Sequence, residues 1–127
     1  MEINKITEEI IKSTIEVHRN LGPGLLESAY EECLCYELEL HSLPYKRQIP
    51  LPLIYKGIQL DCGYRLDLVV DNMVIVEIKA VEKILPIHEA QLITYLKLSN
   101  YHIGLLLNFN VPLMKQGIRR LVCGLKE

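Results

Sequence analysis

Residues 64–80 read Tyr-Arg-Leu-Asp-Leu-Val-Val-Asp-Asn-Met-Val-Ile-Val-Glu-Ile-Lys-Ala. Two runs of β-branched and aliphatic residues flank the turn-prone pair Asp71-Asn72, which predicts a buried β-hairpin. Asp67, Glu77 and Lys79 lie inside these runs, where charges are normally excluded unless they are paired or bind a ligand. Two carboxylates and a lysine are the groups needed to hold a divalent cation beside a phosphate. The stretch therefore predicts a metal-dependent phosphodiesterase.

Side-chain alternation predicts how the two strands pair. A two-residue loop at Asp71-Asn72 would place Asp67 opposite Val76 and mix the two faces. With three residues looped out, or one bulged, Asp67 comes opposite Glu77 and lies near Lys79. The other face is then continuous and apolar, formed by Leu66, Leu68, Val70, Val74, Val76 and Ile78. A one-residue slip would reverse every side chain, so the apolar face selects this register. The alternative interpretation is an exposed sheet face with solvated charges, because the short motif alone is weak.

Size and composition predict one globular domain spanning residues 1–127. Half of the residues are hydrophobic and 24% are charged, which indicates a packed core rather than disorder. The first residues lack the basic-then-apolar order of a signal peptide, and no apolar run approaches the roughly 20 residues of a membrane span. We therefore expect a cytoplasmic protein with no membrane contact.

The cysteines and the net charge narrow the possible functions. The four cysteines show no metal-binding spacing, so we expect reduced structural thiols. A net charge of −2 differs from the basic excess typical of nucleic-acid binders. Any contact with nucleic acid must therefore come from a local patch.

The order of predicted elements indicates the fold class. Helices are predicted at 6–20, 25–41 and 87–98. Strands are predicted at 45–55, 58–60, in the 64–80 hairpin and at 102–108, while 117–123 fits either a strand or a helix. The buried helix positions are expected to be Ile6, Ile10, Thr14, Val17, Leu21, Leu26, Ala29, Cys33, Leu34 and Leu38. A meander, a crossover helix and a further strand, apolar on both faces and placed centrally, predict an α/β (α+β) fold with a mixed sheet flanked by helices.

Two pairs of helical residues are further candidates for a site. Glu27 and Tyr30 lie on one helix face. A glutamate near a helix N-terminus, however, commonly serves only to interact favourably with the helix dipole. Gln91 and Tyr95 also share a face and would position a water or a phosphate oxygen; a polar helix edge is an equal alternative. His18 is expected to be a hydrogen-bonded structural residue, and we expect His88 at the surface or behind the site.

Several separated motifs together resemble a known family. Gly24-Leu25-Leu26-Glu27-Ser28-Ala29-Tyr30 matches the signature that names the GxxExxY protein family. The other matching segments are Val17-His18-Arg19-Asn20-Leu21-Gly22-Pro23, Ile87-His88-Glu89-Ala90-Gln91-Leu92 through Tyr95-Leu96, and Gly104-Leu105-Leu106-Leu107-Asn108-Phe109. The resemblance covers about residues 18–122, with the motifs in the right order.

The family is grouped with the PD-(D/E)XK nuclease superfamily, so the resemblance implies a restriction-endonuclease-like core. It implies that Asp67, Glu77 and Lys79 match the aspartate, acidic residue and lysine of the superfamily. Glu27 matches a helical glutamate that some branches add to the metal site. Gln91 and Tyr95 resemble the Gln-x-x-x-Tyr motif of the exonuclease-like branch; the chain departs from the superfamily name only in having leucine where the name has proline.

These residues predict a Mg²⁺ or Mn²⁺ centre. Asp67, Glu77 and the Ile78 backbone carbonyl would supply oxygen ligands, with Glu27 reaching the metal directly or through water. The ion would polarise the scissile phosphate and acidify a water, and Lys79 would orient that water and stabilise the growing charge. Arg65 would add a phosphate contact.

The expected partner is nucleic acid, with DNA favoured over RNA. The rival function is a catalytically silent nucleic-acid-binding or assembly module that keeps the nuclease fold, which the small size and weak net charge favour. A small-molecule hydrolase with the same metal chemistry is a third alternative. An edge strand near residues 45–55 would allow a homodimer.

Overall fold

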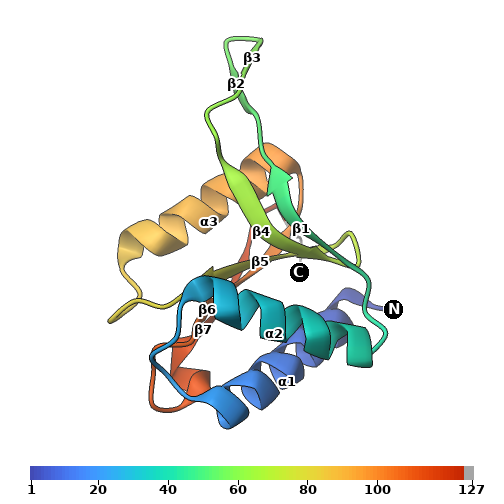
Figure 1. Ribbon diagram of the computed structural model, residues 1–127. Helices are drawn as coiled ribbons and strands as arrows, with labels where there is room; N and C mark the ends of the chain where they lie inside the picture. Colours follow the sequence, from blue (N-terminus) through green and yellow to red (C-terminus); the bar gives the residue numbers. More distant parts are fainter. Residues whose placement is uncertain (125–127) are drawn as a thin grey trace.

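A five-stranded mixed sheet forms the centre of the molecule, with helices on both of its faces (Figure 1). The computed structural model describes residues 1–124. Its elements are α1 (Ile3–Leu21), α2 (Glu27–Leu40), β1 (Tyr45–Pro50), β2 (Leu53–Tyr55), β3 (Ile58–Leu60), β4 (Arg65–Val70), β5 (Val74–Lys79), α3 (Pro86–Ser99), β6 (Ile103–Asn108), the 3₁₀ helix η1 (Met114–Gly117) and β7 (Ile118–Val122). The strand order is β1-β4-β5-β6-β7, in which only β5 and β6 are parallel neighbours. The predicted mixed sheet flanked by helices is confirmed.

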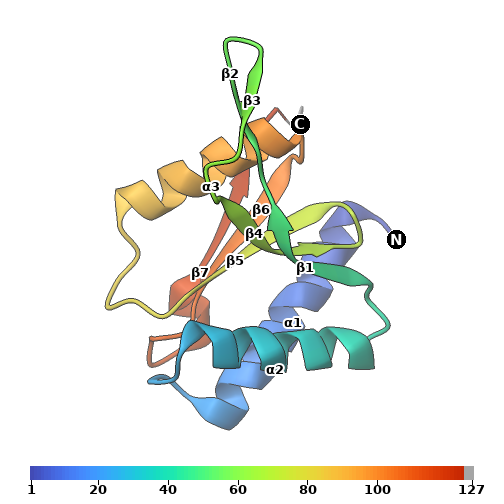
Figure 2. The same cartoon turned by 45° about the horizontal axis from the view of Figure 1, so that its top comes forward.

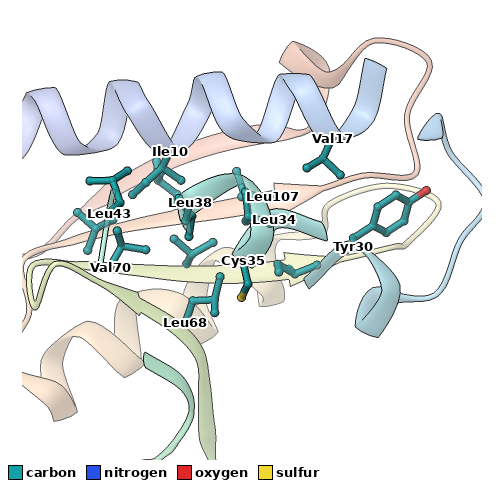
Figure 3. Close-up of a cluster of buried hydrophobic side chains, with 14 of the residues drawn as sticks. Ile10, Val17, Tyr30, Leu34, Cys35, Leu38, Leu43, Leu68, Val70 and Leu107 are labelled. Atoms are coloured by element: carbon teal, nitrogen blue, oxygen red, sulfur yellow. The ribbon is translucent and has the colours of Figure 1, made fainter. Parts of the chain in front are cut away.

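The sheet separates two apolar layers. Helices α1 and α2 pack together on one face, where Ile10, Leu34 and Leu38 meet the strand residues Leu68 and Val70 (Figure 3). Helix α3 covers the other face with a smaller cluster, as the turned view shows (Figure 2). Strand β6 is buried along its whole length and lies between β5 and β7, as its apolar sequence predicted. Both faces of the sheet are therefore covered over its middle strands.

The register predicted for the β4–β5 hairpin is confirmed. Val70 pairs with Val74, so residues 71–73 form the loop. Five members of the predicted apolar face pack against α1 and α2, but Leu66 packs in the α3-side cluster. The prediction was wrong for Leu66, which precedes the part of β4 that pairs with β5: the ladder has no residue before Leu68. The two strands thus separate at the position of Asp67.

The inward face of α2 differs from the prediction. Leu26, Ala29 and Cys33 were expected inside, yet Leu26 is 76% exposed and the other two are only partly buried. The positions actually buried are Tyr30, Glu31, Leu34, Cys35 and Leu38. The large ring of Tyr30 stacks on Phe109 at 4.4 Å, and this contact sets the rotation of the helix. In α1, Leu21 is likewise exposed rather than buried, since it lies in the last turn beside the Gly22 C-cap.

Between β1 and β4 the chain forms a second hairpin, β2–β3, that projects from the sheet (Figures 1 and 2). The single strand predicted over residues 45–55 is divided, because Pro50 and Pro52 lack the N–H groups that a ladder needs. Lys56-Gly57 makes the predicted turn, with both residues at positive φ. Among residues 1–124, no helix combines the length and apolar character needed to cross a membrane.

Candidate functional site

The separation of β4 from β5 brings two carboxylates together. Asp67 and Glu77 each lie one residue beyond the last pair of the β4–β5 ladder, Leu68 with Val76. On the other side of β4, Gln48 lies between the β1 residues that pair with Leu68 and Leu66. Asp67 Oδ2 accepts a hydrogen bond from the Ile78 backbone N–H at 2.9 Å. This bond takes the place of a ladder bond at the point where the strands part. The carboxylate of Asp67 is thereby fixed beside β5.

Glu77 is the most strongly perturbed ionisable group of the site. Its side chain is 6% exposed, and its Oε1 atom has no hydrogen-bond partner. Burial raises the pKa of Glu77 to about 10, and the adjacent Asp67 carboxylate contributes to the increase. The positive charge of Lys79 acts in the opposite direction. A buried carboxylate oxygen without a partner is costly, so a cation at this position would relieve an unfavourable arrangement.

The backbone beyond Lys79 is held by the neighbouring strand. Lys79 pairs with Asn108 of β6, and the Phe109 N–H donates to the Lys79 carbonyl at 3.0 Å. The fully buried Asn108 amide accepts from the Val81 N–H and donates to the Val81 carbonyl, each at 3.0 Å. Gly117 approaches the Asn108 carbonyl so closely that a Cβ there would lie 2.0 Å from the oxygen. These contacts fix the end of β5 and therefore the backbone position from which the Lys79 side chain extends.

A cavity of about 340 Å³ opens between Asp67 and α2; we call it the α2-side cavity. It is lined by Glu27 and Glu31 of α2, together with Gln48, Asp67 and Ile78. The exposed Glu27 therefore faces the same space as Asp67. Among residues 1–124, however, no three His, Cys, Asp or Glu side chains are grouped closely enough to hold a metal ion.

Glu31 and Gln48 belong to this site and were not predicted from the sequence. Glu31 is 7% exposed and forms an ion pair with Arg47 at 2.7 Å. Its Oε1 atom accepts from Gln48 Nε2 at 2.8 Å, and the same amide lies 3.5 Å from Asp67 Oδ1. Gln48 adopts a left-handed backbone conformation, φ 49°, at this point of β1. The one sequence signal was that Glu31 follows Glu27 by four residues, on the same helix face.

Tyr95 of α3 lies on the other side of the sheet from α2, where it packs in one cluster with Leu66 and Ile75. It is buried, and its pKa is raised by burial and, further, by the negative charge of Glu77. Gln91 lies one turn earlier, and both residues line a cavity of about 290 Å³, the α3-side cavity. Tyr64, at the foot of the β2–β3 hairpin, meets the Tyr95 ring edge-on with centroids 6.0 Å apart. The structure places Tyr95 within electrostatic reach of the pair and Gln91 beside it.

Three other candidate residues have structural contacts. Tyr30 is fully buried; its hydroxyl donates to the Gly22 carbonyl and accepts from the Leu25 N–H, so it anchors the loop before α2. His18 bonds the Val111 carbonyl at 2.8 Å, as predicted for a structural histidine. His88 accepts from the Leu85 N–H and caps α3. None of these bonds involves the carboxylate pair.

Acidic and basic residues are unevenly distributed along the chain, although its net charge is small. Residues 1–43, which contain α1 and α2, carry a formal charge of −6, whereas residues 44–124 carry +4. The acidic part lies on one face of the sheet (Figure 1). The positive part includes Lys56 at the tip of the β2–β3 hairpin and Arg65 beside the site. The part of the chain that carries Asp67, Glu77 and Lys79 is therefore basic overall, although the whole chain is weakly acidic.

Comparison with known proteins identifies the family. A family model described as the PD-(D/E)XK nuclease superfamily matches residues 4–121. Searches of curated proteins and of solved structures found no significant match. Membership agrees with the mixed sheet and implies a nucleic acid substrate and, as in this superfamily generally, a divalent metal. The finer GxxExxY assignment stays a prediction. The chain belongs to the PD-(D/E)XK nuclease superfamily.

Proposed function

We propose that this protein is a metal-dependent nuclease that hydrolyses phosphodiester bonds of nucleic acid, with DNA favoured over RNA. The observation that carries the proposal is the unpartnered, buried Oε1 atom of Glu77 beside the fixed carboxylate of Asp67. Soluble proteins rarely bury such an oxygen without a partner. A positively charged ligand between the two side chains is the simplest reason for the arrangement.

The donor set fits Mg²⁺ or Mn²⁺. Mg²⁺ is usually bound through one or two carboxylates, several waters and substrate phosphates, so a cluster of three protein carboxylates is not required. Asp67 and Glu77 would hold the ion, the Ile78 carbonyl would add an oxygen, and Glu27 would act through water across the α2-side cavity. A bound divalent ion supplies positive charge that polarises the phosphate and acidifies water.

The remaining residues would act on the substrate and on the water. Lys79 would stabilise the charge growing on the phosphate and orient the attacking water. Arg65, exposed at the start of β4, would contact a neighbouring phosphate. Gln48, held by Glu31, would keep Asp67 in place. Tyr95 and Gln91 would line the path of the substrate on the other side.

A catalytically silent binding or assembly module is the second candidate. The absence of a group of three metal-binding side chains among residues 1–124 favours it. It does not account for the unpartnered Glu77 oxygen, which a module without a metal would have no reason to keep.

We further propose a cytoplasmic location, and a homodimer formed through the exposed edge strand β1.

The test is cleavage of linear and circular, single- and double-stranded DNA and RNA with Mg²⁺ or Mn²⁺. The wild type is compared with Lys79→Ala and with Lys83→Ala, an exposed lysine just beyond the site. We expect cleavage that requires metal, that Lys79→Ala abolishes and that Lys83→Ala leaves intact. No cleavage, or cleavage that survives Lys79→Ala, would contradict the proposal and favour the binding module.

A further inference from the structure

The α3-side cavity lies between α3 and the start of β4, and no charged side chain lines it. It measures about 290 Å³ and is lined by Tyr64 and Leu53 at the foot of the β2–β3 hairpin and by Ile87, Gln91, Thr94 and Tyr95 of α3. Two large side chains in its walls remain accessible, since Tyr64 is 43% exposed and Ile87 is 67% exposed. A concave surface that is mostly apolar, with a few polar groups, is typical of a ligand site.

The chemistry of the lining suits a nucleobase better than a phosphate. A phosphate is bound most strongly by cationic groups, and no side chain lining this cavity is charged. A base instead needs an aromatic or apolar surface for its face, which Tyr64 and Ile87 offer. It also needs donors and acceptors for its edge, and the Gln91 amide and the Thr94 hydroxyl each provide both.

The position of the cavity connects it to the proposed reaction. Tyr64 contacts Tyr95 and directly precedes β4, which carries Asp67 three residues later. Tyr95 also packs in the same buried cluster as Leu66, the neighbour of Asp67 in the sequence. A strand whose phosphate lies at the carboxylates would therefore bring an adjacent base to this cavity. A base inside a duplex has its faces stacked and its edge paired, so it could not enter the cavity without leaving the stack.

We propose that the α3-side cavity is a subsite for one unpaired nucleobase, with Tyr64 as the stacking residue and Gln91 as the edge contact. The inference rests on the proposed function, since it takes nucleic acid as the ligand. It predicts a preference for single-stranded substrate, or for a nucleotide turned out of a duplex, beside the cleaved bond. Tyr64 and Gln91 are binding residues here and take no part in proton transfer.

The experiment measures binding by fluorescence anisotropy with labelled oligonucleotides about 12 nucleotides long, as single strands and as the matched duplex, in EDTA to prevent cleavage. The variants are Tyr64→Ala, Tyr64→Phe, which keeps the ring, and Ala90→Trp, which fills the cavity from α3. Tyr36→Ala is the control, because Tyr36 is an exposed tyrosine on α2 away from the cavity. Melting temperatures confirm that each variant is folded.

We expect Tyr64→Ala and Ala90→Trp to weaken single-strand binding by roughly 5- to 100-fold, the range for loss of one base-stacking contact. Tyr64→Phe and Tyr36→Ala should bind single strands like the wild type, and duplex binding should change little. Unchanged single-strand binding in both cavity variants, equal losses for duplex and single strand, or no binding by the wild type would each overturn the subsite.

Cleavage by the wild type and by Lys79→Ala is measured in a separate assay. Together with the binding data, it distinguishes failure of the subsite from failure of the proposed nuclease function. Metal-dependent cleavage together with Tyr64-independent binding would overturn the subsite alone. Tyr64-dependent binding without any cleavage would overturn the nuclease and leave the subsite standing.

Discussion

Glu77 is held in a position that costs the folded protein free energy. Its carboxyl is buried, one oxygen has no partner, and Asp67 places a second negative charge beside it. Functional sites often keep such unfavourable arrangements, because the ligand supplies the missing interaction. The side chain is therefore informative about function for the same reason that it is unfavourable for stability.

The substitution Glu77→Gln should stabilise the metal-free protein, because an amide is neutral at every pH, whereas the buried carboxyl must take up a proton on folding above about pH 4.5. The folded-state pKa of about 10 lies above the usual 4.5, so the stability linked to the neutral carboxyl is complete below about pH 4.5 and is lost as the pH rises towards 10. We expect urea denaturation near pH 8 to show a free energy of unfolding that is higher in the variant by on the order of 1–3 kcal/mol. Near pH 5 the increase should be smaller. Glu82→Gln, an exposed neighbour, is the control. If the variant were no more stable than the wild type near pH 8, the buried Glu77 carboxyl would not be destabilising the folded protein.

At the scale of elements, the sequence predicted what depends on alternation and missed what depends on packing. The β4–β5 register followed from the apolar face alone, and with it the expectation that Asp67 and Glu77 lie close together. The rotation of α2 could not be predicted, because it is set by Tyr30 stacking on Phe109, which is distant in sequence. That rotation buries Glu31, so the contact through Gln48 to Asp67 was missed with it.

At the end of β6 the backbone of η1 packs so closely that only glycine fits at position 117. Gly117 of η1 packs against the Asn108 carbonyl, where a Cβ would lie 2.0 Å from the oxygen. Gly117→Ala should therefore shift the chain and lower the free energy of unfolding by roughly 1–3 kcal/mol, measured by urea denaturation. Because Asn108 pairs with Lys79 in the sheet, activity should fall as well.

The control for this prediction is Lys115→Ala, an exposed change in the same short helix. Equal stability of the two variants would mean that η1 can move away from β6 without cost. The site would then not depend on this contact.

At the scale of the whole molecule, charge is divided between an acidic helical layer and a basic remainder. Nucleic acid should be repelled by α1 and α2 and attracted to the side that carries the β2–β3 hairpin and, at its foot, Arg65 as the first residue of β4. The net charge of −2 is the sum of these two opposite contributions and does not reveal how charge is divided between them.

Two charge reversals of equal size test this division. Arg65→Glu should weaken binding of labelled DNA by at least about tenfold at low salt and reduce its salt dependence. Lys12→Glu, on the exposed face of α1, should change binding by no more than about twofold, because the distant charge is screened. Similar losses in the two variants would contradict a localised binding side.

The carboxylate pair itself is tested most directly by calorimetric titration of Mn²⁺ into the wild type and into Glu77→Gln. We predict one bound ion per chain in the wild type, and binding that is at least about tenfold weaker when the Glu77 charge is removed. Glu82→Gln should bind the ion like the wild type. No binding by the wild type, or equal binding by wild type and Glu77→Gln, would contradict a metal centre at Asp67 and Glu77.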